Sequence, residues 1–329
     1  MSNLVDTVRL SIGTAIQLGL EDGPKDNCFT TAFLMTYVDG KCNANCAFCP
    51  QAKESTSSSD RLSRIAWPTY SWNEFVEHFN ESGAFRRVCI QVLNYPNAVD
   101  DLVEMITRLR EATNAPISVS VHPLNKAEMS RLHRAGASSI GIAFDACTES
   151  LFQKIKGHER GSPYTWDSHM ESLSQALEVF GADNVATHLI VGLGESETEA
   201  AQFVLSMKKL GIRVGLFAFT GIRGTSMESV SQPDLGMYRR IQVLRFLVAN
   251  GLISEDQVDC DASGNLRMKV SPELLREYLS SGEAFQTSGC KDCNRPYYNE
   301  RPSGPLYNYP RPLTSEEITE ALRISGLVN

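Results

Sequence analysis

Short apolar segments alternate with longer amphipathic ones along most of the chain. Six segments rich in Val, Ile, Leu, Phe and Ala lie at residues 32–38, 86–94, 117–123, 139–144, 187–194 and 214–222. Helical periodicity occupies several of the intervals, at 98–113, 125–135, 196–210 and 234–250. Nearly continuous apolar strands separated by helices are typical of a parallel sheet buried on both faces. The pattern therefore predicts β/α units in an open doubly wound sheet or a partial barrel, both of which bind ligands at the carboxyl ends of the strands.

The two ends of the chain depart from this alternation. A helical pattern at 272–280 is followed by an irregular segment, 287–313, that is dense in Pro, Asn, Tyr and Arg, and by a last helical pattern at 315–325. An irregular segment of this length is usually functional. We predict three parts: an N-terminal extension (1–30), a β/α body (31–250) and a C-terminal extension (251–329).

Composition narrows the classes of partner. The chain has 329 residues, of which 42% are apolar, and 39 acidic against 31 basic side chains give a net charge of −8. An acidic balance disfavours nucleic acid and anionic membranes as partners, since both attract a basic surface. Asp6 and Arg9 interrupt the apolar core that an export signal needs, and no run of 18 apolar residues occurs. We expect a cytoplasmic protein that binds neither nucleic acid nor membrane.

Three of the nine cysteines are grouped in one loop directly after the first strand. Cys42, Cys46 and Cys49 have the spacing C-x3-C-x2-C. In a reducing compartment such thiols are metal ligands rather than disulfide partners, and thiolates suit iron–sulfur clusters and zinc. Three ligands leave an open coordination position for a substrate or cofactor; the alternative is a zinc knuckle that borrows a fourth ligand. The Ser-rich segment that follows, 51–60, is a lid or a flexible surface loop.

The cysteine spacing, the aromatic residue before the last cysteine and the position after the first strand resemble the radical S-adenosylmethionine enzymes, in particular the biotin-synthase-related members. The resemblance covers residues from about 32 to 225. It implies a partial (β/α)6 TIM-type barrel with N- and C-terminal extensions. It also implies that Cys42, Cys46 and Cys49 hold a [4Fe–4S] cluster whose fourth iron binds S-adenosylmethionine. A reductant such as ferredoxin or flavodoxin would deliver the electron that cleaves this cofactor to a 5′-deoxyadenosyl radical.

The same resemblance carries cofactor contacts to six positions: Phe48, Gln91, Asn94, Asp145, Val191 and Gly192. The strand at 187–194 resembles the strand whose backbone meets the adenine. Asp145 matches a polar residue that faces the ribose, and a helix cap is its alternative. The Gly-Gly-Glu pattern that often ends the second strand of these enzymes is missing, so Gln91 or Asn94 is assigned to the methionine amine.

A second group of thiols is predicted from the irregular segment. Cys290 and Cys293 form a C-x-x-C pair, and Cys28 is another unassigned thiol beside a functional region. Because the two ends of a barrel chain can meet at one mouth, these three thiols are predicted to hold an auxiliary iron–sulfur cluster. The fourth ligand would be Ser303 or an arginine such as Arg311. The alternatives are a zinc site and a purely structural pair.

The remaining cysteines carry weaker signals. Cys89 and Cys147 lie in or just beyond strand patterns and are interpreted as small buried hydrophobic side chains. Cys260, in a polar segment, is an additional ligand candidate. The histidines show no metal-ligand spacing, but His122 and His188 lie near strand ends, from which they would line a site.

The segment GCKDCNRPYYNERPSG, 289–304, resembles the two-protein lipoyl synthases. This implies sulfur insertion into an unactivated C–H bond of an octanoyl chain, with an auxiliary cluster consumed as the sulfur source. The implied partners are an octanoylated lipoyl carrier protein or peptide and a second radical enzyme. By analogy with single-chain lipoyl synthases, Ser303 is the candidate serine ligand. Six residues of this segment are expected either to shape the substrate entrance or to form a packed polar turn network: Arg295, Tyr297, Tyr298, Asn299, Glu300 and Arg301.

Two other functions remain open at this stage. The first is another biotin-synthase-like radical enzyme, for biotin-type sulfur insertion, rearrangement or cofactor maturation, whose auxiliary cluster survives turnover. The second is a non-enzymatic zinc-binding protein. The two radical enzymes share a fold, and a shared fold does not determine the substrate.

Overall fold

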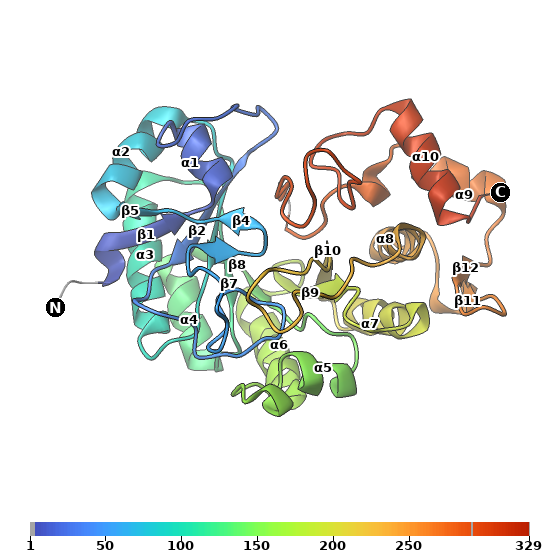
Figure 1. The fold of residues 1–329 in the computed structure, drawn as a ribbon, viewed down its shortest axis with the longest axis horizontal. Helices are drawn as coiled ribbons and strands as arrows, with labels where there is room; N and C mark the ends of the chain where they lie inside the picture. Colours follow the sequence, from blue (N-terminus) through green and yellow to red (C-terminus); the bar gives the residue numbers. More distant parts are fainter. Residues whose placement is uncertain (1–3, 291, 329) are drawn as a thin grey trace.

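The computed structural model describes residues 4–290 and 292–328, and its main element is an eight-stranded sheet with the order β10-β9-β8-β7-β6-β2-β1-β5. Six neighbouring strands are parallel: β2 (Thr31–Thr36), β6 (Arg87–Gln91), β7 (Ile117–Val121), β8 (Ala137–Ile142), β9 (Val185–Val191) and β10 (Arg213–Ala218). They form a partial barrel (Figure 1). The six predicted strands are confirmed, and the barrel rather than the doubly wound sheet is correct.

The N-terminal residues extend this sheet. Strand β1 (Thr7–Leu10) pairs antiparallel with β2, with Arg9 opposite Met35, and β5 (Thr69–Ser71) pairs antiparallel with β1. Two short hairpins lie apart from the sheet: β3 (Arg61–Leu62) with β4 (Ile65–Ala66), and β11 (Val258–Cys260) with β12 (Leu266–Met268).

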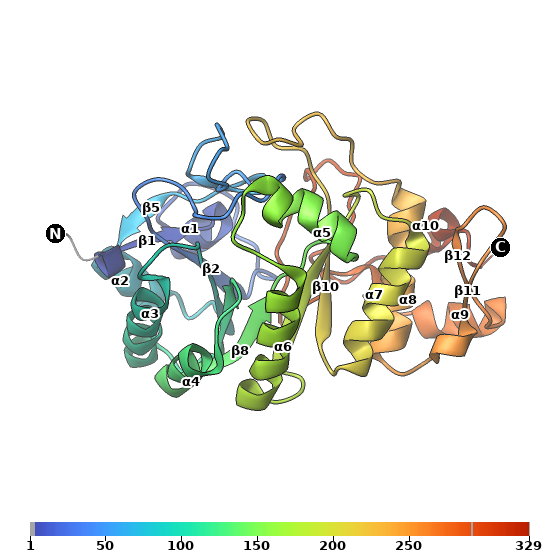
Figure 2. The same cartoon turned by 90° about the horizontal axis from the view of Figure 1, so that it is seen from below.

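Ten α-helices are present in the described residues, and most of them cover the outside of the sheet. They are α1 (Ile12–Leu18), α2 (Trp72–Ser82), α3 (Ala98–Ala112), α4 (Lys126–Ala135), α5 (Glu149–Ile155), α6 (Trp166–Phe180), α7 (Glu197–Lys209), α8 (Leu235–Ala249), α9 (Pro272–Leu279) and α10 (Ser315–Ser325). Short 3-10 turns occur at Leu4–Asp6, His158–Arg160, Glu255–Gln257 and Glu283–Phe285. Figure 2 shows α3, α4, α6 and α7 in a row along the outer face of the strands.

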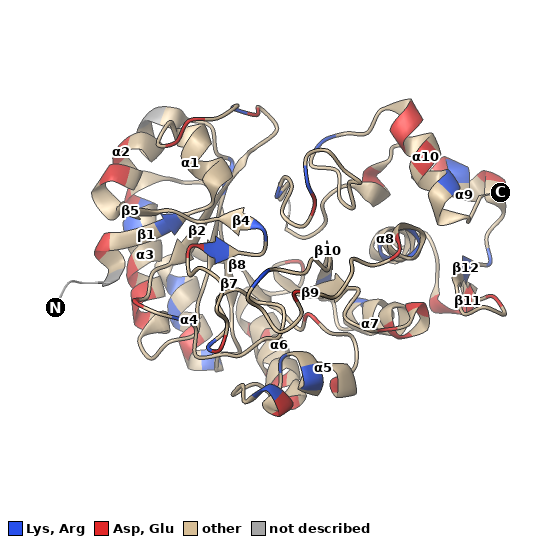
Figure 3. Cartoon of the chain, in the orientation of Figure 1, with Lys and Arg blue, Asp and Glu red and all other residues tan. Residues whose placement is uncertain are grey.

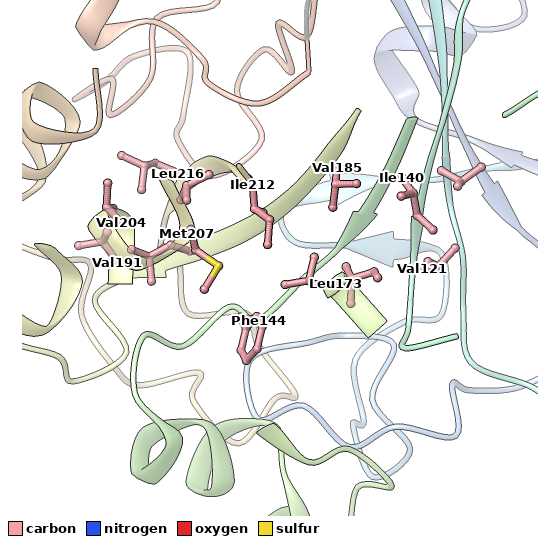
Figure 4. Packing of buried hydrophobic residues seen from close by; sticks show 14 of the residues in the cluster. Val121, Ile140, Phe144, Leu173, Val185, Val191, Val204, Met207, Ile212 and Leu216 are labelled. Atoms are coloured by element: carbon pink, nitrogen blue, oxygen red, sulfur yellow. The ribbon is translucent and has the colours of Figure 1, made fainter. Parts of the chain in front are cut away.

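The main core lies between the strands and these outer helices. Leu173 of α6 and Val204 and Met207 of α7 pack against side chains of the strands (Figure 4). Phe144, at the end of β8, is fully buried, and its ring centroid lies 4.4 Å from that of Trp166. Burial of such side chains contributes about 1.5–3 kcal/mol each to folding.

Charged residues occupy the outer helices. Figure 3 shows acidic and basic residues close together along α7 and α10, rather than one sign gathered on one element. Helix α7 has Glu197 and Glu199 in its first turn and Lys208 and Lys209 in its last, which complements the helix dipole. No helix among the described residues is long and apolar enough to cross a membrane.

Residues 287–313, called the tail below, return from the C-terminal helices to the barrel. Arg239 of α8, only 2% exposed, donates hydrogen bonds to the carbonyl oxygens of Leu306 at 2.5 Å and Tyr307 at 2.7 Å. Arg64, between β3 and β4, donates to the carbonyl oxygen of Tyr297 at 3.0 Å. These buried and part-buried hydrogen bonds satisfy backbone carbonyls of the tail and hold the tail against the barrel.

Candidate functional site

A cavity of about 220 Å³ lies at the carboxyl-terminal halves of the parallel strands. Cys42, Cys46 and Cys49 all line it. The apolar part of the wall includes Phe33, Met35, Leu62, Leu93, Val121, Ile190, Phe217 and Phe219. The polar part includes Gln91, Ser120, His122, Asp145, Lys156, Tyr164, His188 and Arg295. The location agrees with the prediction that ligands bind where the strands end, and both histidines predicted near strand ends line the cavity.

The cysteine loop is held mainly by its own backbone. The Cys42 N–H donates to the Gln51 carbonyl at 3.0 Å, and the Cys49 N–H donates to the Cys46 carbonyl at 3.0 Å. The side chain of Lys41 also links the two ends of the loop, because its Nζ donates to the Pro50 carbonyl oxygen at 2.7 Å. The segment 51–60 is tied to the segment after β10, because the Thr56 N–H donates to the Gly224 carbonyl at 2.9 Å. The loop is thus ordered around the cavity.

The environment of Cys42, Cys46 and Cys49 fits a bound group that stabilises their thiolate forms. Burial, and next the charge of Cys42, raises the pKa of Cys49 to about 12; burial raises the pKa of Cys46, and the charges of Cys49 and Cys42 raise it further. Thiolates at such positions need a compensating positive charge, which an iron–sulfur cluster supplies through its irons. Two polar atoms of the cavity wall, Gln51 Oε1 and His122 Nδ1, are buried without a hydrogen-bond partner. Both observations fit a polar group bound in the cavity.

Among the described residues, no three His, Cys, Asp or Glu side chains converge on a point where one metal ion would sit. A four-iron cluster does not need such convergence, because each cysteine binds a different iron.

A buried ion pair stands beside the thiols. Lys156 Nζ lies 2.7 Å from Asp145 Oδ2, and the two side chains are 8% and 10% exposed. Lys156 also donates to the carbonyl oxygen of Ala143. Burial acts to lower the pKa of Lys156, but the charges of Asp145 and Cys46 outweigh burial, so that its pKa is raised. The ammonium group therefore stays charged next to the thiols.

The backbone holds Asp145 in an unusual conformation. Its φ is +67°, in the left-handed region, where a non-glycine residue is uncommon. Its N–H donates to the His188 carbonyl at 2.9 Å, and its carbonyl accepts from the Ile190 N–H at 2.8 Å. Thr148, not Asp145, caps the following helix α5. The helix-cap interpretation of Asp145 is therefore wrong, and its carboxylate lines the cavity.

The other predicted cofactor contacts fall into two groups. Phe48 and Gln91 line the cavity. Asn94 contacts the cysteine loop instead: its N–H lies 3.2 Å from Cys42 Sγ, and its Nδ2 donates to the Tyr164 hydroxyl at 3.0 Å.

Val191 and Gly192, predicted to meet the adenine, are not among the residues that line the cavity. The Gly192 N–H donates to Glu195 Oε1 at 2.6 Å, and its φ is +105°. Their contact with a nucleoside stays a prediction.

The predicted ligands of the second site are spread out. Cys290 and Cys293 are partly buried and share a turn, in which the Cys293 N–H donates to the Cys290 carbonyl at 3.0 Å. Cys28 and Ser303 are exposed. Arg311 is paired with Glu317 on the surface at 2.8 Å. Ligation by these residues stays a prediction.

The tail enters the site more deeply than its polar sequence indicates. Arg295, Tyr298 and Asn299 line the cavity. The Arg295 guanidinium lies 3.7 Å from the centroid of the Phe217 ring, a cation–π contact. Behind this wall the buried Glu300 carboxylate accepts from the Asn299 N–H at 2.9 Å. The tail therefore forms both the cavity wall and a polar turn network.

Lys156 and Tyr164 are among the cavity residues that were not predicted. Lys156 follows the short helix α5, and nothing in its local sequence distinguishes it from the other lysines. The Lys156 ammonium lies over the Tyr164 ring, 5.6 Å from the ring centroid. A single lysine and a single tyrosine on connecting segments carry no periodicity, so only the fold identifies them.

Comparisons with known proteins agree with this geometry. The family model for the radical SAM superfamily matches residues 37–207, more than half of the chain. The biotin synthase of Leptospira biflexa is 24% identical over 269 residues, which are 78% of this chain and 73% of that protein. The biotin synthase of Prochlorococcus marinus is 25% identical over 68% of this chain and 63% of that protein, less than two thirds of its length.

Among solved structures, the FeFe-hydrogenase maturase HydG of Carboxydothermus hydrogenoformans aligns with 95% of this chain and 74% of its own, with a TM-score of 0.54 and 14% identity. At this identity the similarity shows the fold alone, and it agrees with the partial barrel.

Proposed function

The chain belongs to the radical SAM superfamily, and from this premise we propose that it is a sulfurtransferase that inserts sulfur into an unactivated C–H bond of a protein-bound octanoyl chain. It would act as one component of a two-protein lipoyl synthase. The observation that carries the proposal is the position of its two cysteine groups. The thiols of the loop line the cavity, and the tail that bears Cys290 and Cys293 forms part of the same cavity wall.

The loop thiols, Cys42, Cys46 and Cys49, would hold the [4Fe–4S] cluster of the family. When bound, this cluster and S-adenosylmethionine would supply radical chemistry able to remove a hydrogen atom from an unactivated C–H bond, and an auxiliary cluster would supply the sulfur. The protein's part is to bind, orient and exclude water. Lys156 places a positive charge beside the thiolates, and Asp145 holds that lysine in position.

The apolar part of the cavity wall suits an alkyl chain. Phe33, Met35, Leu93, Val121 and Ile190 are apolar side chains of this wall. An octanoyl chain carries no charge that these residues would have to neutralise, and burying its methylenes is favourable by about 0.8 kcal/mol each. The octanoyl group would be carried by a lipoyl carrier protein, the electron by ferredoxin or flavodoxin, and the second sulfur insertion by a partner enzyme.

A second function is favoured by the named relatives. Because the biotin synthases are similar over most of this chain, biotin-type sulfur insertion, rearrangement or cofactor maturation is the competing assignment. In that case an auxiliary cluster would survive turnover.

Incubation with a reductant, S-adenosylmethionine and an octanoyl-lysine peptide tests the proposal. We expect a peptide that has gained sulfur by mass spectrometry, with loss of auxiliary-cluster iron and formation of 5′-deoxyadenosine. The same reaction with dethiobiotin is the matched control. If the octanoyl peptide gains no sulfur, either with or without a partner enzyme, the lipoyl assignment is ruled out. Thiolation of dethiobiotin would support the competing assignment.

A further inference from the structure

Cys89 points into the barrel. On β6 it lies in register with Phe33 of β2 on one side and Ser118 of β7 on the other. Side chains two residues apart on a strand share a face, and both Phe33 and Gln91 line the cavity. The Gln91 Nε2 lies 3.2 Å from Cys89 Sγ. Cys89 therefore occupies the layer of the barrel interior directly below Gln91, farther from the mouth.

The cysteine-bearing part of the tail reaches the same layer. The Leu216 N–H of β10 donates to Ser288 Oγ at 2.8 Å, and Thr31 Oγ1 of β2 donates to the Asp292 carbonyl at 2.8 Å. The tail thus contacts both the first and the last of the parallel strands, and β6 is the neighbour of β2 in the sheet. Cys293 packs on the same group of buried side chains as Cys89.

Cys290 and Cys293 lie together in this part of the tail. The Cys293 N–H donates to the Cys290 carbonyl oxygen at 3.0 Å, and both side chains are partly buried. Two residues after Cys293, the Arg295 Nε is buried without a hydrogen-bond partner.

Cys28, by contrast, is on the outside. It is exposed, its N–H donates to Asp26 Oδ1 at 2.8 Å, and it precedes the first residue of β2, Thr31.

We infer that Cys89, Cys290 and Cys293 are the thiolate ligands of the auxiliary iron–sulfur cluster, and that Cys28 is not. The inference rests on the proposed function for the existence of this cluster and goes beyond it in assigning the ligands. Three soft ligands from β6 and the tail leave one iron position free for a further ligand or the substrate. The Cys89 thiol lies two residues before Gln91 on β6, and Gln91 lines the cavity together with the loop thiols.

Iron binding tests the inference without catalysis. In a background variant that lacks the first site, Cys42→Ala/Cys46→Ala/Cys49→Ala, anaerobic reconstitution should leave about four irons and four sulfides per chain, with a Mössbauer spectrum of one cluster type. Adding Cys89→Ala should reduce iron at least about five-fold relative to this background, because the remaining thiol pair holds a cluster weakly. Adding Cys28→Ala, the matched control, should change nothing.

Iron at the loop thiols serves as the control for correct folding of the variants. Cys89→Ala in the otherwise unchanged chain should keep about four irons at the loop thiols, and Cys89→Ser, which keeps the side-chain size and offers a weaker oxygen ligand, should retain part of the second cluster. Retention of the second cluster in Cys89→Ala overturns the inference, whether or not Cys28→Ala loses it.

The outcomes separate the inference from the proposed function. If the cluster depends on Cys28, the ligand assignment is wrong while sulfur insertion stands. If the background variant binds no iron, both fail. If Cys89 is required but the octanoyl peptide gains no sulfur, the ligand assignment stands and the lipoyl assignment fails.

Discussion

The loop after β2 and the tail both present cysteines to one barrel, but they are built in different ways. The loop places Cys42 and Cys49 with backbone hydrogen bonds to residues no more than nine positions away. The tail depends on side chains from distant elements, such as Arg239 of α8 and Arg64 between β3 and β4. The difference teaches that the spacing of the loop cysteines is set within a short piece of chain, whereas the position of the tail cysteines depends on contacts with elements far away in the sequence.

The largest expected effect comes from removing a loop thiol. Cys46→Ala should lower the formation of 5′-deoxyadenosine at least about 1,000-fold, equivalent to about 4 kcal/mol, because the remaining thiols hold the cluster poorly. Chromatographic quantification of 5′-deoxyadenosine measures this. Cys147→Ala, at a buried cysteine outside both groups, is the control and should retain activity. Equal rates in the two variants would contradict the assignment of the loop as the radical site.

The next effect concerns the ion pair beside the loop. Lys156→Met leaves the Asp145 carboxylate buried without its partner, and we expect a loss of about 3–5 kcal/mol in the free energy of unfolding. Lys126→Met is the matched control, since Lys126 pairs with Glu178 on the surface and should contribute less than about 1 kcal/mol. Urea denaturation measures both. Similar losses would show that the buried pair is not a structural part of the site.

A smaller effect should separate the two cysteine groups. Arg239→Met removes hydrogen bonds to the carbonyls of Leu306 and Tyr307, and we expect a loss of about 2–3 kcal/mol because buried acceptors are left unpaired. A chelator should then remove auxiliary-cluster iron faster, while iron at the loop stays. Arg323→Met, which breaks an exposed pair with Glu320, is the control. Equal acceleration at both sites would contradict the separate construction of loop and tail.

The smallest effect lies at the outer end of the tail. The Arg311 guanidinium lowers the pKa of Glu317 from 4.5 to about 2. A carboxyl with a lowered pKa stabilises the folded state above its unfolded pKa, and this stabilisation is lost as the pH falls towards 2. Because the pair is on the surface, Arg311→Gln should cost less than about 1 kcal/mol at pH 7. Urea denaturation between pH 7 and pH 2 should show that the difference in unfolding free energy between the wild type and Arg311→Gln vanishes as the pH falls. A difference that stays constant with pH would show that it comes from packing and not from the ion pair.

Much of the fold could be predicted because it is periodic. Alternating apolar and amphipathic segments identified the six parallel strands and helices such as α3, α7 and α8 within a few residues of their observed bounds. Helices α2 and α6 were not predicted. In α2 the stripe of Trp72, Phe75 and Phe79 is helical in period but lies within a polar segment, so its mean apolar content is low.

The sequence by itself determined the cysteine loop, since Cys42, Cys46 and Cys49 lie within eight residues and the chain between them is too short to separate them. Only the tertiary structure decided that Lys156 pairs with Asp145, and that Cys89 packs on the same buried side chains as Cys293 while Cys28 is exposed. The physical reason is register. Which face of β6 a side chain occupies, and where a tail more than 200 residues later crosses the barrel, depend on strand pairing and on buried anchors such as Arg239.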